Sequence, residues 1–165
     1  MADENVRYDL DNYEYISKAL WDLVNTYPDL GNEAFSFAEV DSEEGNAFIP
    51  TSGAVIMSEI DDVTGHTTQE CVYPFTLVSR AGGLSENNKL KIKEWLDSLG
   101  KWLERQPVTV GNNVYQIETY PELTGDREIK KIERTQPCYL SEVGEDNVET
   151  WVISLQATYR NEFDR

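Results

Sequence analysis

The sequence predicts an α+β domain in which two helices pack on a largely antiparallel β-sheet. Residues 9–27 and 86–106 place apolar side chains three and four positions apart, the spacing of a helix that buries one face. Other segments alternate apolar and polar residues, as strands that bury one face do. Short stretches rich in Gly, Asn and Asp join these strands. The predicted order is therefore helix, β-meander, helix, β-meander, which is typical of the α+β class.

The length and composition of the chain indicate one folded domain. Its 165 residues suit a single domain over 1–165, with residues 1–8 as a flexible N-terminal tail. An apolar content of 39% argues against intrinsic disorder. No apolar run is long enough to cross a membrane, and the acidic N-terminus lacks the apolar core of a signal peptide. We expect a soluble protein that is made and assembled inside a cell.

The first helix is predicted over residues 9–27. Asp9 and Asp11 suit its N-terminal end, where carboxylates favour the helix dipole. Pro28 and Gly31 end it. Its apolar stripe consists of Tyr13, Ile16, Leu20, Leu23, Val24 and Tyr27.

The first meander is predicted from three extended segments. A strand over residues 35–40 is followed by residues 47–60, which Pro50 and Gly53 interrupt. A long strand over residues 67–81 comes next, and Pro74 within it predicts a bulge or a sheet edge. The face of this strand expected to be buried carries Cys71, Tyr73, Phe75 and Leu77.

The second helix is predicted over residues 86–106. Ser85 is a suitable N-cap, and the Gln106–Pro107 pair ends the helix. Its apolar stripe consists of Ile92, Trp95, Leu96, Leu99, Trp102 and Leu103.

The last third of the chain is predicted to be a second meander. Residues 108–120 have the turn chemistry of a hairpin around "GNN". Residues 128–140 alternate in part, residues 148–159 alternate clearly, and the loop at 141–147 joins them as a hairpin. In the last segment, the predicted buried face consists of Trp151, Ile153, Leu155, Ala157 and Tyr159.

The charge of the chain excludes one class of function. It has 31 acidic and 14 basic residues, for a formal net charge of -17. Such a surface repels phosphates, so sequence-specific DNA binding is not expected. An acidic surface also suits the wall of a conduit through which DNA slides without sticking, although an ordinary solvated surface explains most acidic chains.

One short stretch, "IDDVTGHTTQEC" at residues 60–71, has the residue types of a chemical site. His66 is the only histidine, and Asp61 and Asp62 precede it. A metal site usually needs three or four converging ligands, and the spacing supplies no others. The Asp- and Gly-rich "DDVTG" favours a polar hairpin tip. A small hydrolase or transferase that uses His66 with Asp61 or Asp62 remains the alternative from another functional class.

Other sequence features give no sign of a cofactor. Gly82 and Gly83 match neither a phosphate-binding loop nor a dinucleotide-binding fingerprint. Cys71 and Cys138 lie in no CxxC motif and are expected to be free, buried thiols.

Four stretches together resemble a known family. The similarity extends over most of residues 9–165 and rests on the order and wording of these stretches, of which the closing "NEFDR" is the most distinctive. The family is that of the tail-terminator proteins of tailed phages that infect Gram-positive bacteria, often described as minor capsid or head–tail joining proteins. The stretches are "PTSGAVIMSEIDDVTGHTTQECVYPFTLVSRA", "KIKEWLDSLGKWLERQP", "YPELTGDREIKKIERTQPCYL" and "VETWVISLQATYRNEFDR".

This resemblance implies a structural virion protein without enzymatic activity or cofactor. The subunit would form a homo-hexameric ring that caps the tail tube, stops its polymerisation and provides the surface for head attachment. Its partners would be the tail-tube protein and the head–tail connector proteins, and DNA would pass through the ring without specific binding. Its place would be the head-proximal end of the phage tail, assembled in the host cytoplasm. Another connector or tail-tube ring protein of the same particle is the nearest alternative.

The ring hypothesis directs attention to two groups of charged residues. Acidic loop residues are candidates for the lumen or for a partner-facing surface. They are Asp41, Glu43, Glu44, Glu142, Glu145 and Asp146. Scarce basic residues are candidates for contacts between subunits. They are Lys89, Lys91, Lys93, Lys130 and Lys131.

Overall fold

The computed structural model describes residues 6–11, 16–31, 34–38, 45–83, 85–123, 126–144 and 147–165. It has two helices and a largely antiparallel mixed sheet, which confirms the predicted α+β fold. The elements are α1 (Lys18–Val24), β1 (Phe35–Phe37), β2 (Gly45–Pro50), β3 (Val55–Asp61), β4 (His66–Ala81), α2 (Glu86–Leu103), β5 (Val108–Val110), β6 (Asn113–Tyr115), β7 (Arg127–Arg134), β8 (Tyr139–Val143) and β9 (Glu149–Asp164). No helix in this part of the chain is both long and apolar enough to span a membrane.

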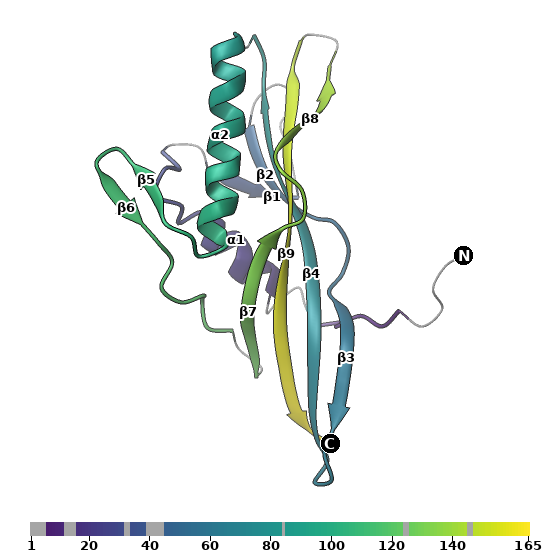
Figure 1. The fold of residues 1–165 in the computed structure, drawn as a ribbon. Coiled ribbons are helices and arrows are strands. Elements are labelled where there is room, and N and C mark those ends of the chain that lie inside the picture. The colour runs from purple at the N-terminus through teal and green to yellow at the C-terminus, as the bar shows by residue number, and fades with distance from the viewer. Residues whose placement is uncertain are drawn as a thin grey trace.

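Two long antiparallel strands, β4 and β9, form the axis of the fold (Figure 1). At the end where β3 and β4 form a hairpin, β3 pairs with β4 and β7 pairs with β9. At the opposite end, β2 pairs with β4 and β8 pairs with β9, while β1 adds to β2 in parallel. The sheet therefore has four edge strands, which are β3 and β7 at one end and β1 and β8 at the other.

The helices cover one face of this sheet. The inward residues of β4, which include Tyr73, Phe75 and Leu77, are at most 1% exposed, as the alternation predicted. They pair with Ala157, Leu155 and Ile153 of β9, which the same core buries. The apolar stripe of α2 packs here, with Leu96, Leu99 and Leu103 at 0% exposure. Figure 1 shows α2 beside the upper half of the sheet and the β5–β6 hairpin projecting from it.

The first helix is shorter than predicted. It spans Lys18–Val24, and Tyr13 of the predicted stripe lies outside the described residues. Asp9 does not stand at a helix end, because its backbone N–H donates to the carbonyl of Ala54 at 2.8 Å, beside β3. After Val24, the side chain of Asn25 bonds to the backbone of Phe35, which turns the chain into β1.

Three other predicted boundaries also shift. Helix α2 ends at Leu103 because Arg105 adopts a positive φ of 65° and the carboxylate of Glu104 binds Arg134. Strand β1 ends at Phe37, where Ala38 has a φ of 57°. Strand β9 continues beyond residue 159 to Asp164, paired with β4 throughout.

The position of Pro74 shows how a proline fits into a central strand. Pro74 pairs with Gln156 of β9 without a bulge, so the predicted bulge is absent at this residue. On the other side of β4, β2 ends opposite Phe75 and β3 begins opposite Val72. The carbonyl of Pro74 accepts from Thr51 in this gap, and a strand residue directs its N and C=O to the same side. The missing N–H therefore points into a local edge, where the ladder does not need it.

Candidate functional site

The stretch around His66 forms the tight β3–β4 hairpin. The Asp62 carboxylate accepts hydrogen bonds from the backbone N–H groups of Thr64 and His66 at 2.8 and 3.0 Å. The hydroxyl of Thr64 also donates to it, and this bond is the main cause that lowers the pKa of Asp62. Asp62 therefore serves the turn, as turn aspartates do.

His66 pairs with a carboxylate at the other end of the chain. Its Nδ1 lies 2.8 Å from Oδ1 of Asp164 on β9, and this hydrogen bond raises the pKa of His66. Cys71 points to the helix-covered face and is 0% exposed, so it lies in the core rather than beside the imidazole. Burial raises the pKa of its thiol to about 11, which keeps it protonated. Within the described ranges, no three His, Cys, Asp or Glu side chains are grouped as metal ligands.

A buried polar cluster joins the N-terminal segment to the sheet. The carboxylate of Asp9 accepts hydrogen bonds from Nε and Nη2 of Arg127 at 3.0 and 2.9 Å, which form a bidentate salt bridge. The hydroxyl of Tyr159 donates to the same carboxylate at 2.6 Å. All three side chains are at most 9% exposed. The cluster therefore fixes Asp9 against β7 and β9.

The pKa values in this cluster follow from its contacts. Burial by itself raises the pKa of Asp9, but the hydrogen bonds from Arg127 and Tyr159 outweigh it and leave the pKa below its ordinary value. Burial and the bond to Asp9 raise the pKa of Tyr159, so its hydroxyl keeps its proton. Sequence patterns do not reveal this cluster, because its three members lie far apart in the chain.

Most of the candidate basic residues have carboxylate partners in their own chain. Lys93 is 2.8 Å from Asp97, one helical turn on, and this hydrogen bond raises the pKa of Lys93. Lys89 lies 3.5 Å from the buried Glu149. Lys130 and Lys131 lie 3.0 and 3.6 Å from Glu128 and Glu133 on the same strand. Lys91 is exposed, and no described carboxylate lies within salt-bridge distance of it.

The candidate acidic residues divide into two groups. Glu142 was predicted to lie in the loop at 141–147, but it lies on β8, which extends to Val143, and it is exposed. Asp41, Glu43, Glu44, Glu145 and Asp146 lie outside the described residues.

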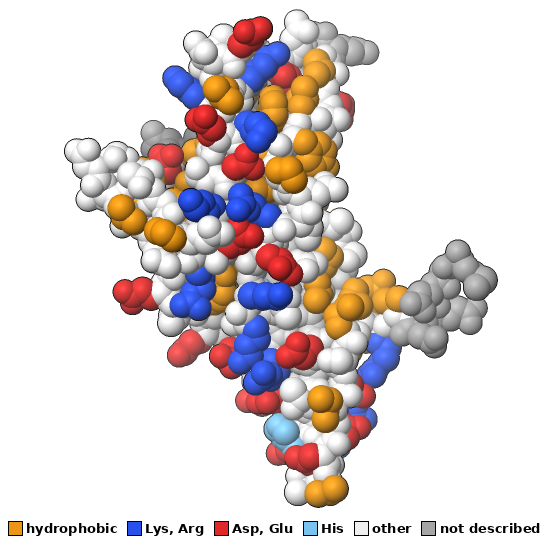
Figure 2. Space-filling model, viewed as in Figure 1, with side chains coloured by type: hydrophobic (Ala, Val, Ile, Leu, Met, Phe, Trp, Pro, Cys, Tyr) orange, Lys and Arg blue, Asp and Glu red, His pale blue; other side chains and the backbone are white. Residues whose placement is uncertain are grey.

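Charge is distributed unevenly along the chain. Residues 86–134 hold nine of the 14 Lys and Arg residues together with nine carboxylates. Residues 1–85 hold three cations and 16 carboxylates. Figure 2 shows Lys and Arg interspersed with Asp and Glu over α2 and β7. The surface of α2 and β7 is therefore close to neutral, and the excess negative charge lies on the rest of the chain.

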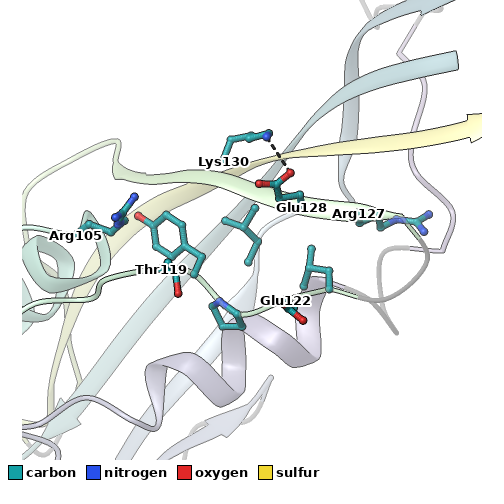
Figure 3. Close-up of a pocket in the computed structure, with 10 residues that line it drawn as sticks. Arg105, Thr119, Glu122, Arg127, Glu128 and Lys130 are labelled. Carbon is teal, nitrogen blue, oxygen red and sulfur yellow. Dashed lines mark ion pairs between the residues drawn. The ribbon is translucent and has the colours of Figure 1, made fainter.

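A shallow pocket of about 510 Å³ lies between β7 and the segment that leads to it (Figure 3). At one end, Arg105 donates to the carbonyls of Ile117 and Glu118 and lies over the Tyr120 ring. Lys130 and Glu128 pair with each other at its rim, and Arg127 points away from the other side chains. Partners within the chain thus hold the cations of this pocket.

Two of the four sheet edges are closed by side chains. On β7, the N–H of Ile132 donates to the Tyr120 hydroxyl at 3.2 Å, and the N–H of Arg134 donates to Glu104 at 3.1 Å. On β1, Asn25 accepts from the N–H of Phe35, and the indole of Trp21 donates to the Phe35 carbonyl. Closed edges of this kind prevent pairing with another chain.

The other two edges are open within the described part of the chain. Strand β8 is exposed at all five residues, and Tyr139, Leu140 and Val143 are 42%, 40% and 55% exposed. No outer-edge backbone bond to these residues occurs in the described part of the chain. Figure 2 shows hydrophobic side chains over the position of β8 at the upper end.

Strand β3 is covered only at its start. Tyr8 bridges to Val55, and Ile56 donates to the Arg7 carbonyl at 2.8 Å. Beyond Ile56, the described residues provide no backbone partner on the outer side. Met57 and Ile60 are 65% and 68% exposed along this stretch. The sequence shows these apolar residues, but it does not show that their strands are edges.

The chain matches no protein-family model and no curated protein.

Proposed function

We propose that this chain is a structural subunit of a phage tail, a terminator that forms a ring at the head-proximal end of the tail tube. The observation that carries the proposal is where the four family-like stretches lie in the fold. They comprise β3 with β4, most of α2, β7 with the start of β8 (Tyr139 and Leu140), and β9. The resemblance thus concerns the central framework of the domain rather than a single surface loop.

Two features of the surface support an assembly role. In the described part of the chain, the seven-stranded sheet has two open edges with exposed apolar residues, and exposed edges of this kind are where further strands add. A closed ring of identical subunits needs two different patches on each subunit, and β3 and β8 are two such patches. The net charge of -17 suits a wall that DNA passes without binding.

Deletion of the gene from the particle's genome tests the proposal. Loss of a terminator leaves tube growth unchecked, so electron micrographs should show tails of irregular, extended length and filled heads without tails. Supplying the protein in trans should restore uniform tails. Tails of normal length that merely lack heads would instead assign the chain to a connector ring. Normal particles would contradict both structural roles.

A further inference from the structure

Among the described residues of the seven-stranded sheet, β8 and β3 are the two edges to which another strand can add. The edges of β1 and β7 are closed by Asn25, Trp21, Tyr120 and Glu104, as described above. Exposed apolar side chains lie on the two open edges: Met57 and Ile60 on β3, and Tyr139, Leu140 and Val143 on β8. Each edge has one register shift, between Ile56 and Ser58 on β3 and between Leu140 and Glu142 on β8. An apolar edge that is otherwise uncovered is a site for strand addition.

The geometry points to pairing between β8 of one subunit and β3 of the next in the ring. This inference rests on the proposed function, because it names the contact by which the ring closes. The partner at each edge is a second copy of this chain, because one chain carries both open edges. They lie on opposite sides of the β4–β9 axis and at opposite ends of it, so pairing is head to tail.

The lengths of the two edges agree. Strand β8 has five residues. On β3, the stretch left uncovered after Ile56 runs from residue 57 to residue 61, which is also five residues. Backbone hydrogen bonds would supply affinity along this length, and the exposed apolar side chains of both strands would supply specificity.

The charges at the two edges are also compatible. Glu142 is the one charged residue of β8. Beside β3, the half-exposed guanidinium groups of Arg7 and Arg165 lie 3.3 and 3.0 Å from Glu59, and Arg165 lies 3.9 Å from Asp61. Glu142 would therefore approach a locally neutral edge that presents two cations, although the chain as a whole is strongly acidic.

Cysteine cross-linking tests the pairing directly. Met57→Cys and Leu140→Cys place thiols on the two edges, and the native Cys71 and Cys138 are 0% and 2% exposed and therefore protected. The double variant, treated with a bifunctional maleimide on tails or at high protein concentration, should give a ladder of covalent oligomers. A mixture of the two single variants should stop at dimers, and each single variant alone should stay monomeric.

Three results would overturn the inference. Leu140→Cys alone cross-linking as well as the mixture would indicate a two-fold β8–β8 contact. Cross-links to a different tail protein would identify another chain as the occupant of the edge. A double variant that cross-links no better than Met57→Cys paired with Val114→Cys, a 67% exposed position on β6, would show that the edges do not meet.

A charge placed on the edge provides an independent measurement. Leu140→Lys should weaken self-association roughly tenfold or more in sedimentation, because an edge lysine blocks strand addition. Val114→Lys is the matched control and should leave it unchanged. Equal assembly of both variants would contradict the inference. The gene deletion reports on the tail role and the cross-links report on the subunit contact, so either can fail without the other.

Discussion

At the scale of single residues, the buried Asp9–Arg127 pair is the contact with the largest expected effect on stability. Asp9→Asn removes the nearest carboxylate charge from the guanidinium of Arg127, a residue 9% exposed. Breaking a buried pair from one side typically costs about 3–5 kcal/mol. Urea unfolding should show this loss. Asp11→Asn is the control: Asp11 lies 3.9 Å from the same guanidinium but its side chain is 77% exposed, so the free energy of unfolding should change by less than about 1 kcal/mol.

The same pair predicts a pH dependence. The pKa of Asp9 is lowered in the folded state, so its stabilisation is fully present above the unfolded pKa and is lost as pH falls through the folded pKa. The parent should therefore lose stability below about pH 4, where an unfolded aspartate begins to titrate. Asp9→Asn should lose less over that interval. An equal slope in both proteins would show that Asp9 does not titrate as the contacts imply.

We expect the pKa of His66 to depend on Asp164, and we expect the side chain of His66 to have no role in tail function. The bond to Asp164 is the main cause that raises the pKa of His66, so Asp164→Asn should return it toward its ordinary value in an NMR titration. Stabilisation from a raised histidine pKa is present below the unfolded pKa and is lost as pH rises through the folded pKa.

His66→Ala should leave tail assembly and infectivity near normal. Loss of infectivity in a folded, assembled variant would instead favour the enzymatic alternative.

At the scale of secondary-structure elements, Gly100 sets how closely α2 approaches the sheet. A Cβ at this position would lie 2.6 Å from Cδ of Arg134 and 2.8 Å from Cδ1 of Ile153. Ile153 is 0% exposed, and Glu104 holds Arg134, so neither neighbour moves freely. Gly100→Ala should therefore destabilise the domain by about 1–3 kcal/mol, against a gain in helix propensity of about 1 kcal/mol. Thermal unfolding of this variant beside Lys101→Ala, an exposed neighbour, measures the effect.

A Gly100→Ala variant as stable as the parent would show that α2 can shift away from β9. Helix α2 would then be a weakly fixed cover on the sheet. The stripe of Leu96, Leu99 and Leu103, each 0% exposed, argues for the opposite.

The elements also show how far the sequence could predict the fold. Helix α2, the β3–β4 hairpin and the long strands were predictable because each has a clear period and clear end signals. The start of the first helix was not, because Asp9 suits a helix end locally and only the distant Arg127 and Tyr159 place it elsewhere. Pro74 was ambiguous for the same reason, since whether it faces a neighbour depends on where β2 ends and β3 begins.

The candidate site was less predictable than the fold. The sequence identified the charged residues but not their partners, and Lys93, Lys130 and Lys131 pair with carboxylates two to four positions away. The open edges depend on strand order, which no local pattern encodes. Tyr139 and Leu140 are residue types found in any strand. Only the pairing of β8 with β9 shows that the outer side of β8 has no backbone partner among the described residues.

At the scale of the whole molecule, the balance between net charge and edge pairing decides how the subunits associate. Each copy carries a formal charge of -17, so copies repel one another at low ionic strength. The basic residues of α2 and β7 are largely paired within their own subunit. They therefore have little free charge with which to attract a neighbour's carboxylates.

Salt should consequently strengthen self-association. Raising NaCl from about 50 mM to about 500 mM shortens the screening length and reduces the repulsion between subunits, while backbone pairing and apolar contacts at β8 and β3 persist. Light scattering across this range should show a growing oligomer fraction for the parent and a flat response for Leu140→Lys, whose edge is blocked. An interface built mainly from exposed Lys–carboxylate pairs would respond in the opposite direction, because screening weakens such pairs. If the parent instead dissociates when salt is added, the interface would be formed by exposed lysines rather than by strand edges. The candidates are Lys89, Lys91, Lys93, Lys130 and Lys131.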